Sequence, residues 1–240
     1  MALFSLYALI SIEAHAINVA AFGDSITRGF PYYSDDANGW ANTGGYIPTL
    51  QSQLNQNDWG SGSSVTVYNW GHPGEYVIGQ GDHRFPSPIL DNHPDYVLIL
   101  EGTNDLALHW NGPSTIANTL NGIVLDVIAA GRVPMIGTML PRFDNKASDS
   151  SIRDLNDHIR ANAAATNTEV AEFYSASSNW NSLMTDGLHP NHSGYVLMAD
   201  VWFDTMLRYK ETQEKIAEEK ERARIAGSLQ GPYLLLLLSD

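Results

Sequence analysis

One short stretch, residues 19–27, constrains the fold most, because an apolar run breaks there at a glycine and leads directly to a serine. The apolar part, Val-Ala-Ala-Phe, is typical of a buried strand. Gly23 permits a sharp turn that leaves Ser25 outside the carboxyl end of this strand, where open α/β sheets bind their ligands. Ser25 is therefore a candidate nucleophile. The alternative is a plain turn in which Asp24 or Ser25 caps the next helix.

The rest of the chain alternates between predicted strands and predicted helices. Five short apolar runs, rich in β-branched and aliphatic residues, are the predicted strands: residues 17–22, 65–70, 96–100, 133–140 and 169–174. The predicted helices are residues 46–55, 87–92, 114–130 and 151–165, with a final one from Asn191 onward. This alternation predicts a parallel sheet covered by helices on both faces.

Length, charge and cysteine usage exclude several classes of protein. The 240 residues suit one well-buried core with an appendage. The formal net charge is −14, and residues 208–240 hold six basic and six acidic side chains, so the acidic excess lies in residues 1–207. A body this acidic repels phosphate backbones and anionic membranes, so we expect no nucleic-acid partner. The absence of cysteine excludes a thiol nucleophile and cysteine-ligated metal.

The first segment, residues 1–16, carries an apolar block and ends Ala14-His15-Ala16, a small-x-small pattern typical of a signal-peptidase site. It favours a secreted or periplasmic protein. No Lys or Arg lies in this segment, so an ordinary N-terminal helix or strand of a cytoplasmic protein is the alternative. Elsewhere no apolar run approaches the length of a membrane span, and we expect no stable membrane insertion.

The last segment, residues 208–240, changes to a charged composition with opposite charges four residues apart, as at Glu218 and Arg222. Such pairs favour a solvated helix, here a C-terminal extension that follows a domain of residues 17–207. The alternative is self-association or partner binding through this helix. Ile216 and Ile225 do not form the heptad seam that a coiled coil needs.

Polar residues cluster after the predicted strands, where a parallel sheet would bring them to one edge. Ser25 follows the first strand, residues 69–74 follow the second, residues 101–105 the third, and residues 186–189 lie in the loop after the fifth. A hydroxyl, an imidazole, a carboxylate and amide donors are the components of acyl transfer. The Gly-x-Ser-x-Gly elbow is absent, which argues against the α/β-hydrolase fold.

Four motifs in this order resemble the blocks of the SGNH hydrolases, also called GDSL-type esterases and lipases. They are Gly23-Asp24-Ser25, Asn69-x-Gly71-x-x-Gly74, Gly102-x-Asn104-Asp105 and Asp186-x-x-His189. The resemblance covers about residues 17–207 and implies a flavodoxin-like three-layer sandwich with a five-stranded parallel sheet. Glu101, just before the third motif, stands where an apolar residue is more readily expected.

The resemblance also implies residue roles. Ser25 corresponds to the nucleophile, His189 to the general base and Asp186 to its orienting partner. The backbone N–H groups of Ser25 and Gly74, with the side-chain amide of Asn104, correspond to the oxyanion hole. This assignment needs neither a metal nor an organic cofactor.

Each residue also has a plainer interpretation. Gly71 and Gly74 shape a turn in any fold, and Asn104 suits an ordinary loop amide. His192 is a rival for the base, although its surroundings favour a helix start. His189 and His192 suggest a metal site only if a third ligand accompanies them, and no zinc-like spacing is evident.

The expected activity is hydrolysis of carboxylic esters with short to medium acyl chains. The alternatives are a carbohydrate acetylesterase, a lysophospholipase, or an idle glycan- or lipid-binding domain on the same fold. Trp110, Tyr76 and Phe143 are candidate substrate contacts, because aromatic side chains in loops near the crevice line pockets or stack on sugars. Arg142 is expected to form a structural ion pair, with binding of an anionic substrate group as the alternative.

Overall fold

The computed structural model describes residues 16–33, 44–57, 59–60, 62–108 and 111–237. Two sequence predictions lie outside these residues. They are the N-terminal apolar segment up to residue 15 and the substrate contact at Trp110.

Five strands form one parallel sheet in the order β2-β1-β3-β4-β5. They are β1 (Ile17–Gly23), β2 (Val65–Gly71), β3 (Tyr96–Leu100), β4 (Val133–Gly137) and β5 (Glu169–Ala171). The register of β1 with its two neighbours sets Gly23 of β1 beside Gly71 of β2 and Leu100 of β3. Three strands therefore end at the same level, and the segments that follow them emerge together.

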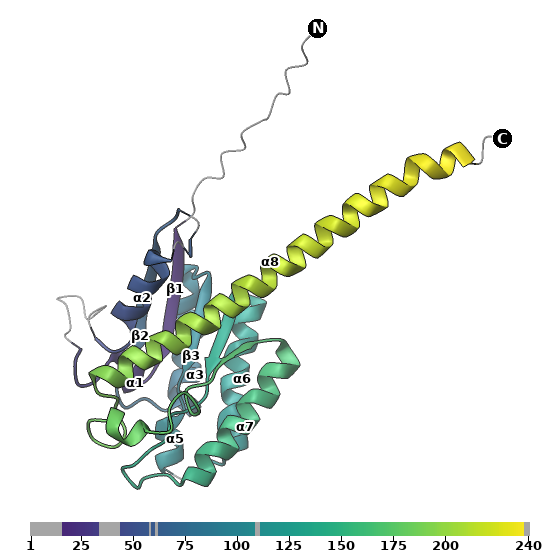
Figure 1. The fold of residues 1–240 in the computed structure, drawn as a ribbon. Coiled ribbons are helices and arrows are strands. Elements are labelled where there is room, and N and C mark those ends of the chain that lie inside the picture. Colours follow the sequence, from purple (N-terminus) through teal and green to yellow (C-terminus); the bar gives the residue numbers. More distant parts are fainter. Residues whose placement is uncertain (1–15, 34–43, 58, 61, 109–110, 238–240) are drawn as a thin grey trace.

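Long helices cover both faces of the sheet (Figure 1). On one face α2 (Ile47–Gln56) packs with α8 (His192–Leu237), and on the other α6 (Pro113–Ala129) packs with α7 (Asp149–Thr166). Short helical turns lie in the connections: α1 (Ser25–Arg28), η1 (Val77–Gly81), α3 (Asp82–Arg84), α4 (Pro86–Ile89), η2 (Leu90–Asn92), α5 (Thr103–Leu108) and η3 (Trp180–Leu183). The predicted three-layer α/β sandwich is confirmed.

Two predicted strands are too long at their carboxyl ends. The fourth stops at Gly137 rather than residue 140, because the buried Asn156 side chain of α7 replaces a neighbouring strand. Its amide accepts a hydrogen bond from Met139 N (2.7 Å) and donates one to Met139 O (3.0 Å). The fifth stops at Ala171, whose carbonyl accepts a hydrogen bond from Phe173 N in a turn.

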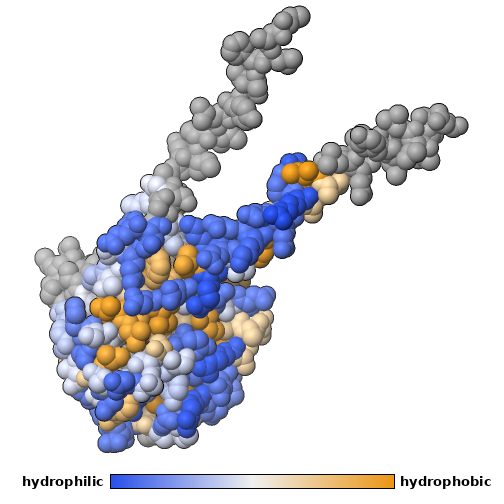
Figure 2. Space-filling model, viewed as in Figure 1, coloured by the Kyte–Doolittle hydropathy of each residue, from blue (hydrophilic) through white to orange (hydrophobic). Residues whose placement is uncertain are grey.

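Helix α8 begins as a core helix and ends as a projection. Its buried side chains, Tyr195, Met198, Trp202 and Met206, recur every three or four residues and face the sheet. Its last described contact with the body is at Lys210, whose ammonium donates to Trp59 O (3.2 Å). Residues 211–226 are all exposed, and Figure 2 shows this projecting part as mainly hydrophilic. The helix runs without a break across the domain boundary predicted at residue 208.

The described part of the chain contains no helix that is both long enough and apolar enough to cross a lipid bilayer.

The outer edge of β2 is covered by side chains of α2. The Asn55 amide donates to Val65 O (2.8 Å) and accepts from Val65 N (2.9 Å), and Gln51 Oε1 accepts from Val67 N (2.8 Å). The unpaired N–H and C=O groups of an open strand edge can bind a strand of another chain. In β2 the hydrogen bonds from α2 occupy these groups at Val65 and Val67.

We predict that Asn55→Ala lowers the free energy of unfolding by about 1–3 kcal/mol, because it removes both hydrogen bonds to Val65. Urea unfolding followed by circular dichroism measures this change. The matched control is Gln56→Ala on the same helix, since the Gln56 amide reaches only the exposed Ser52 hydroxyl. Equal losses in the two variants would show that the edge contacts contribute nothing.

Candidate active site

The turn after β1 presents Ser25 in a fixed position. A Cβ atom on Gly23 would lie 2.1 Å from Leu100 O, so only glycine fits where β1 meets the end of β3. Asp24 caps α1, accepting a hydrogen bond from Ile26 N (2.8 Å). Capping therefore belongs to Asp24. The Ser25 hydroxyl, on a residue only 7% exposed, is left for another partner.

That partner is His189, which lies 164 residues further along the chain. Ser25 Oγ is 2.8 Å from His189 Nε2, and His189 Nδ1 is 2.8 Å from Asp186 Oδ2. The three side chains form one hydrogen-bonded line in the order that nucleophilic catalysis by serine requires. His192, the rival base, is the first residue of α8 and is exposed, with its ring 6.3 Å from that of Tyr32.

The loop before α8 holds Asp186 and His189 in this arrangement. Asp186 Oδ1 accepts hydrogen bonds from Leu188 N (3.1 Å) and His189 N (2.8 Å), and Thr185 N donates to His189 O (2.8 Å). Burial pushes the pKa of the Asp186 carboxyl upward, but the hydrogen bonds from His189 and Leu188 outweigh it and hold this pKa below its ordinary value. Asp186 is therefore a carboxylate that can orient an imidazole.

The predicted oxyanion donors come from all three central strand ends. The loop after β2 is tied to the serine turn by His72 N, which donates to Gly23 O (2.8 Å). Asn104, at the start of α5, donates its side-chain amide to Glu75 O (2.8 Å) and so lies against the Gly74–Glu75 segment. Ser25, as the first residue of α1, has a backbone N–H that its own helix does not use.

Asp105 binds the backbone of the segment that follows Gly74. Its buried carboxylate accepts hydrogen bonds from Val77 N (2.9 Å) and Ile78 N (3.1 Å). The fourth residue of the Gly102-x-Asn104-Asp105 motif therefore fixes the segment that follows Gly74. The sequence analysis gave this residue no role.

Arg142 serves the structure, as predicted. Its buried guanidinium forms an ion pair with Asp144 (2.6 Å) and donates to Thr103 O (2.6 Å). The bond to Thr103 O joins the segment after β4 to the segment after β3, and the ion pair holds the guanidinium in place within its own loop.

The predicted aromatic contacts have different surroundings. Phe143 is exposed and lies beside the histidine loop, since its backbone N donates to Gly187 O (2.7 Å). Tyr76 is half-buried next to Glu75. Phe30 was not among the predicted contacts; its ring is 4.6 Å from that of His189 and is 37% exposed. Its position directly after Gly29 could have indicated this contact, because Gly29 ends α1 and turns the chain back toward Ser25.

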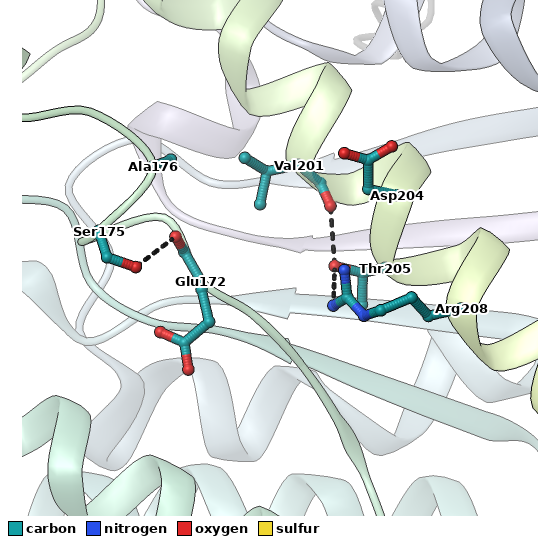
Figure 3. Close-up of a pocket in the computed structure, with 7 residues that line it drawn as sticks. All are labelled: Glu172, Ser175, Ala176, Val201, Asp204, Thr205 and Arg208. Atoms are coloured by element: carbon teal, nitrogen blue, oxygen red, sulfur yellow. Dashed lines mark hydrogen bonds between the residues drawn. The ribbon is translucent and has the colours of Figure 1, made fainter.

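Two cavities differ in their relation to this site. One, of about 420 Å³, adjoins the predicted oxyanion donor Gly74 and is lined by His72, Pro73, Gly74, Glu75 and Gln80. The other, of about 450 Å³, lies between the segment after β5 and α8 (Figure 3). Its polar side chains bond among themselves and to nearby residues, as where Arg208 donates to Thr205 Oγ1 (3.1 Å) and Arg160 pairs with Glu172.

Within the described residues, no group of three or more His, Asp or Glu side chains is arranged to hold a metal ion.

Comparison with known protein families shows to which family this chain belongs. The model of the GDSL-like lipase/acylhydrolase family matches residues 21–197, which include all four sequence motifs. The chain belongs to this family. It is accordingly a hydrolase of ester bonds. No curated protein matches the sequence.

Several solved structures share the fold. A lipase/acylhydrolase from Enterococcus faecalis is 24% identical, with a TM-score of 0.63 over 78% of this chain and 94% of its own. A variant of an acetyl xylan esterase from Geobacillus stearothermophilus is 21% identical, with a TM-score of 0.62 over 79% and 94%. A psychrotrophic esterase from Pseudoalteromonas, inhibited by monoethylphosphonate, is 18% identical, with a TM-score of 0.63 over 81% and 98%.

An acidic side chain is buried directly beside Ser25 in this GDSL-type hydrolase. Asp24 is 1% exposed. Burial raises its pKa to about 7, and the neighbouring Asp105 and Glu75 add to the rise against the hydrogen bond from Ile26 and the charge of Arg142. The folded protein therefore holds a proton on Asp24 at pH values where the unfolded chain has released it.

We predict that Asp24→Asn gains stability relative to wild type as the pH rises from 4 to 8. Folding raises the pKa of Asp24 from 3.8 to about 7, so its ionisation destabilises the wild type progressively across this interval. The variant escapes this loss, which amounts to at most about 4 kcal/mol. Urea unfolding at both pH values measures the difference, with the exposed Asp126→Asn as control. A stability difference independent of pH would contradict the prediction.

Proposed function

We propose that this protein is a serine esterase in which Ser25, His189 and Asp186 are the catalytic residues and which acts on carboxylic esters of short to medium acyl chains. The observation that carries the proposal is the continuous hydrogen-bonded line from Ser25 Oγ through the imidazole to Asp186, with both bonds at 2.8 Å. Removal of a proton from a hydroxyl by a properly oriented imidazole is the common way to activate serine.

The reaction proceeds in two steps. Ser25 Oγ attacks the ester carbonyl carbon while its proton passes to His189 Nε2, and Asp186 stabilises the imidazolium that forms. The imidazolium then gives this proton to the departing alcohol oxygen, which leaves an acyl group on Ser25. Water attacks the acyl carbon in the second step, losing a proton to His189, and Ser25 recovers its proton when the acid departs.

The negative charge on the carbonyl oxygen is held by three donors: the backbone N–H groups of Ser25 and Gly74 and the amide of Asn104. The bond from Asn104 to Glu75 O uses one of its two amide hydrogens and leaves the other for the substrate. Fixed donors of this kind stabilise the transition state more than the ground state.

We predict that Ser25→Ala and His189→Ala each lower kcat by roughly 10⁴- to 10⁶-fold, and that Asn104→Ala lowers it by about 10²- to 10³-fold. Hydrolysis of p-nitrophenyl acetate and butyrate measures these losses. The control is Ser175→Ala, whose hydroxyl lines the other cavity. A Ser25→Ala variant as active as wild type would refute the assignment.

A second candidate, a carbohydrate acetylesterase, is favoured by the cavity beside Gly74. Four of its five lining residues are His72, Gly74, Glu75 and Gln80, which offer hydrogen-bonding groups rather than an apolar channel for a long chain. The exposed rings of Phe30 and Phe143 near the histidine loop suit the faces of a sugar. One solved relative of the same fold is an acetyl xylan esterase.

If the alcohol part of the substrate is a sugar, we predict that Gln80→Ala raises KM for acetylated xylo-oligosaccharides about 10-fold and leaves KM for p-nitrophenyl acetate unchanged. The reason is that a sugar hydroxyl loses a hydrogen-bonding partner, whereas the small aryl ester does not reach one. Competition between the two substrates in one assay measures both constants. Equal effects on both substrates, or preference for octanoate and palmitate esters over acetate, would exclude the sugar candidate.

A further inference from the structure

One buried acid close to the proposed oxyanion hole is left without a hydrogen-bond donor. Glu101 directly follows β3 and is 0% exposed. Neither of its carboxyl oxygens accepts a hydrogen bond from a donor group of the described residues. A buried carboxylate without a donor is one of the most unfavourable groups a protein interior can contain, so a second feature must compensate for it.

Charged groups on three other segments act electrostatically on Glu101. They are Asp24 in the serine turn, Glu75 in the loop after β2, and Arg84 on α3. Gly81 of η1 lies against the same carboxyl group, since a Cβ there would be 2.6 Å from Glu101 Oε2. The space that a side chain would occupy at this position is filled by the Glu101 carboxyl.

The single positive charge in this group is committed to Glu75. Arg84 Nε donates to both Glu75 oxygens (2.8 and 3.0 Å), and Arg84 Nη2 donates to the same carboxylate. One guanidinium balances one carboxylate, and Glu75 is that carboxylate. Glu101 therefore has no cation of its own and lies beside the Glu75 anion. A proton shared between the two carboxyl groups removes their charge repulsion and gives each a hydrogen-bond partner.

We propose that Glu101, as a neutral carboxylic acid, donates a hydrogen bond to the Glu75 carboxylate and is thereby a positioning residue for the oxyanion hole. The proton stays on Glu101, and a Glu75 oxygen accepts the hydrogen bond. The inference rests on the proposed function, because it requires that the backbone N–H of Gly74 is an oxyanion donor.

The connection to the reacting atoms runs through Glu75. Its side chain is held by Arg84 and Glu101, and its carbonyl oxygen accepts the hydrogen bond from Asn104 (2.8 Å). Glu75 follows Gly74 directly, so fixing Glu75 at both ends fixes the backbone N–H of Gly74 and the amide of Asn104 together. Burial raises the pKa of Glu101 well above its ordinary value, and the charges of Glu75 and Asp24 raise it further against the effect of Arg84.

Two substitutions separate this role from simple packing. Glu101→Gln keeps the size of the side chain and supplies an N–H donor to Glu75, so we expect kcat within about 3-fold of wild type. Glu101→Leu fills a similar volume without a donor. It removes a buried polar group and should fold at least as well as wild type. We nevertheless expect its kcat to fall about 10- to 100-fold at nearly unchanged KM, because the oxyanion donors lose their alignment.

Protonation of Glu101 is measured independently of activity. The infrared difference spectrum of wild type minus Glu101→Gln at neutral pH should contain the carbonyl stretch of a neutral carboxylic acid. Its absence would overturn the proposal. As a stability control, Thr205→Val removes a buried hydroxyl on α8, away from this loop, and should leave kcat unchanged.

The kinetic outcomes are equally decisive. A Glu101→Leu variant with wild-type kcat, or a Glu101→Gln variant as impaired as Glu101→Leu, would contradict a positioning role that acts through a hydrogen bond. Failure of the proposed function looks different: wild type and Ser25→Ala would then hydrolyse esters equally slowly, while the infrared test of Glu101 would still give its own answer.

Discussion

The parallel register of β1 with β2 and β3 is the constraint on which the site depends. It brings Gly23, Gly71 and Leu100 to one level, so the segments after them meet although they lie far apart in the sequence. The approach is so close that a Cβ on Gly23 would collide with Leu100 O. Ser25, the loop of Gly74 and the amide of Asn104 are neighbours because these three strands end together.

The second requirement is the loop before α8, which brings Asp186 and His189 from late in the sequence to Ser25. Asp186 and His189 arrive from the segment before α8, and α8 is anchored in the core by Tyr195, Trp202 and their neighbours. The end of the loop that joins α8 is thereby fixed, and hydrogen bonds to the Asp186 carboxylate fix the loop itself. A rigid base is useful for catalysis, because a small displacement of the imidazole removes it from hydrogen-bonding distance of the serine.

The sheet and the four long helices could be predicted from sequence, because apolar runs and helix-forming segments are local signals. The motifs also indicated Ser25, Asp186 and His189, and the His189 ring lies within hydrogen-bonding distance of the other two side chains. The end of β5 is set by a turn in which Phe173 N donates to Ala171 O, and it was not predicted. The end of β4 was not predicted either, since it depends on Asn156, which comes from another layer and replaces a strand partner for Met139. Phe30 and Asp105 were missed for a related reason. Their significance lies in contacts with His189 and with the η1 backbone, which no spacing in the sequence encodes. Glu101 was noticed as unusual in the sequence, but only its burial beside Glu75 and Arg84 gives that observation a physical meaning.

The central claim is that His189 activates the Ser25 hydroxyl, and covalent labelling tests it most directly. A fluorophosphonate should react once per chain at neutral pH, and mass spectrometry of the digested protein should locate the adduct on the peptide that contains Ser25. We expect no adduct in Ser25→Ala and labelling slowed by orders of magnitude in His189→Ala. Labelling of a different residue, or equal labelling rates in wild type and His189→Ala, would contradict it.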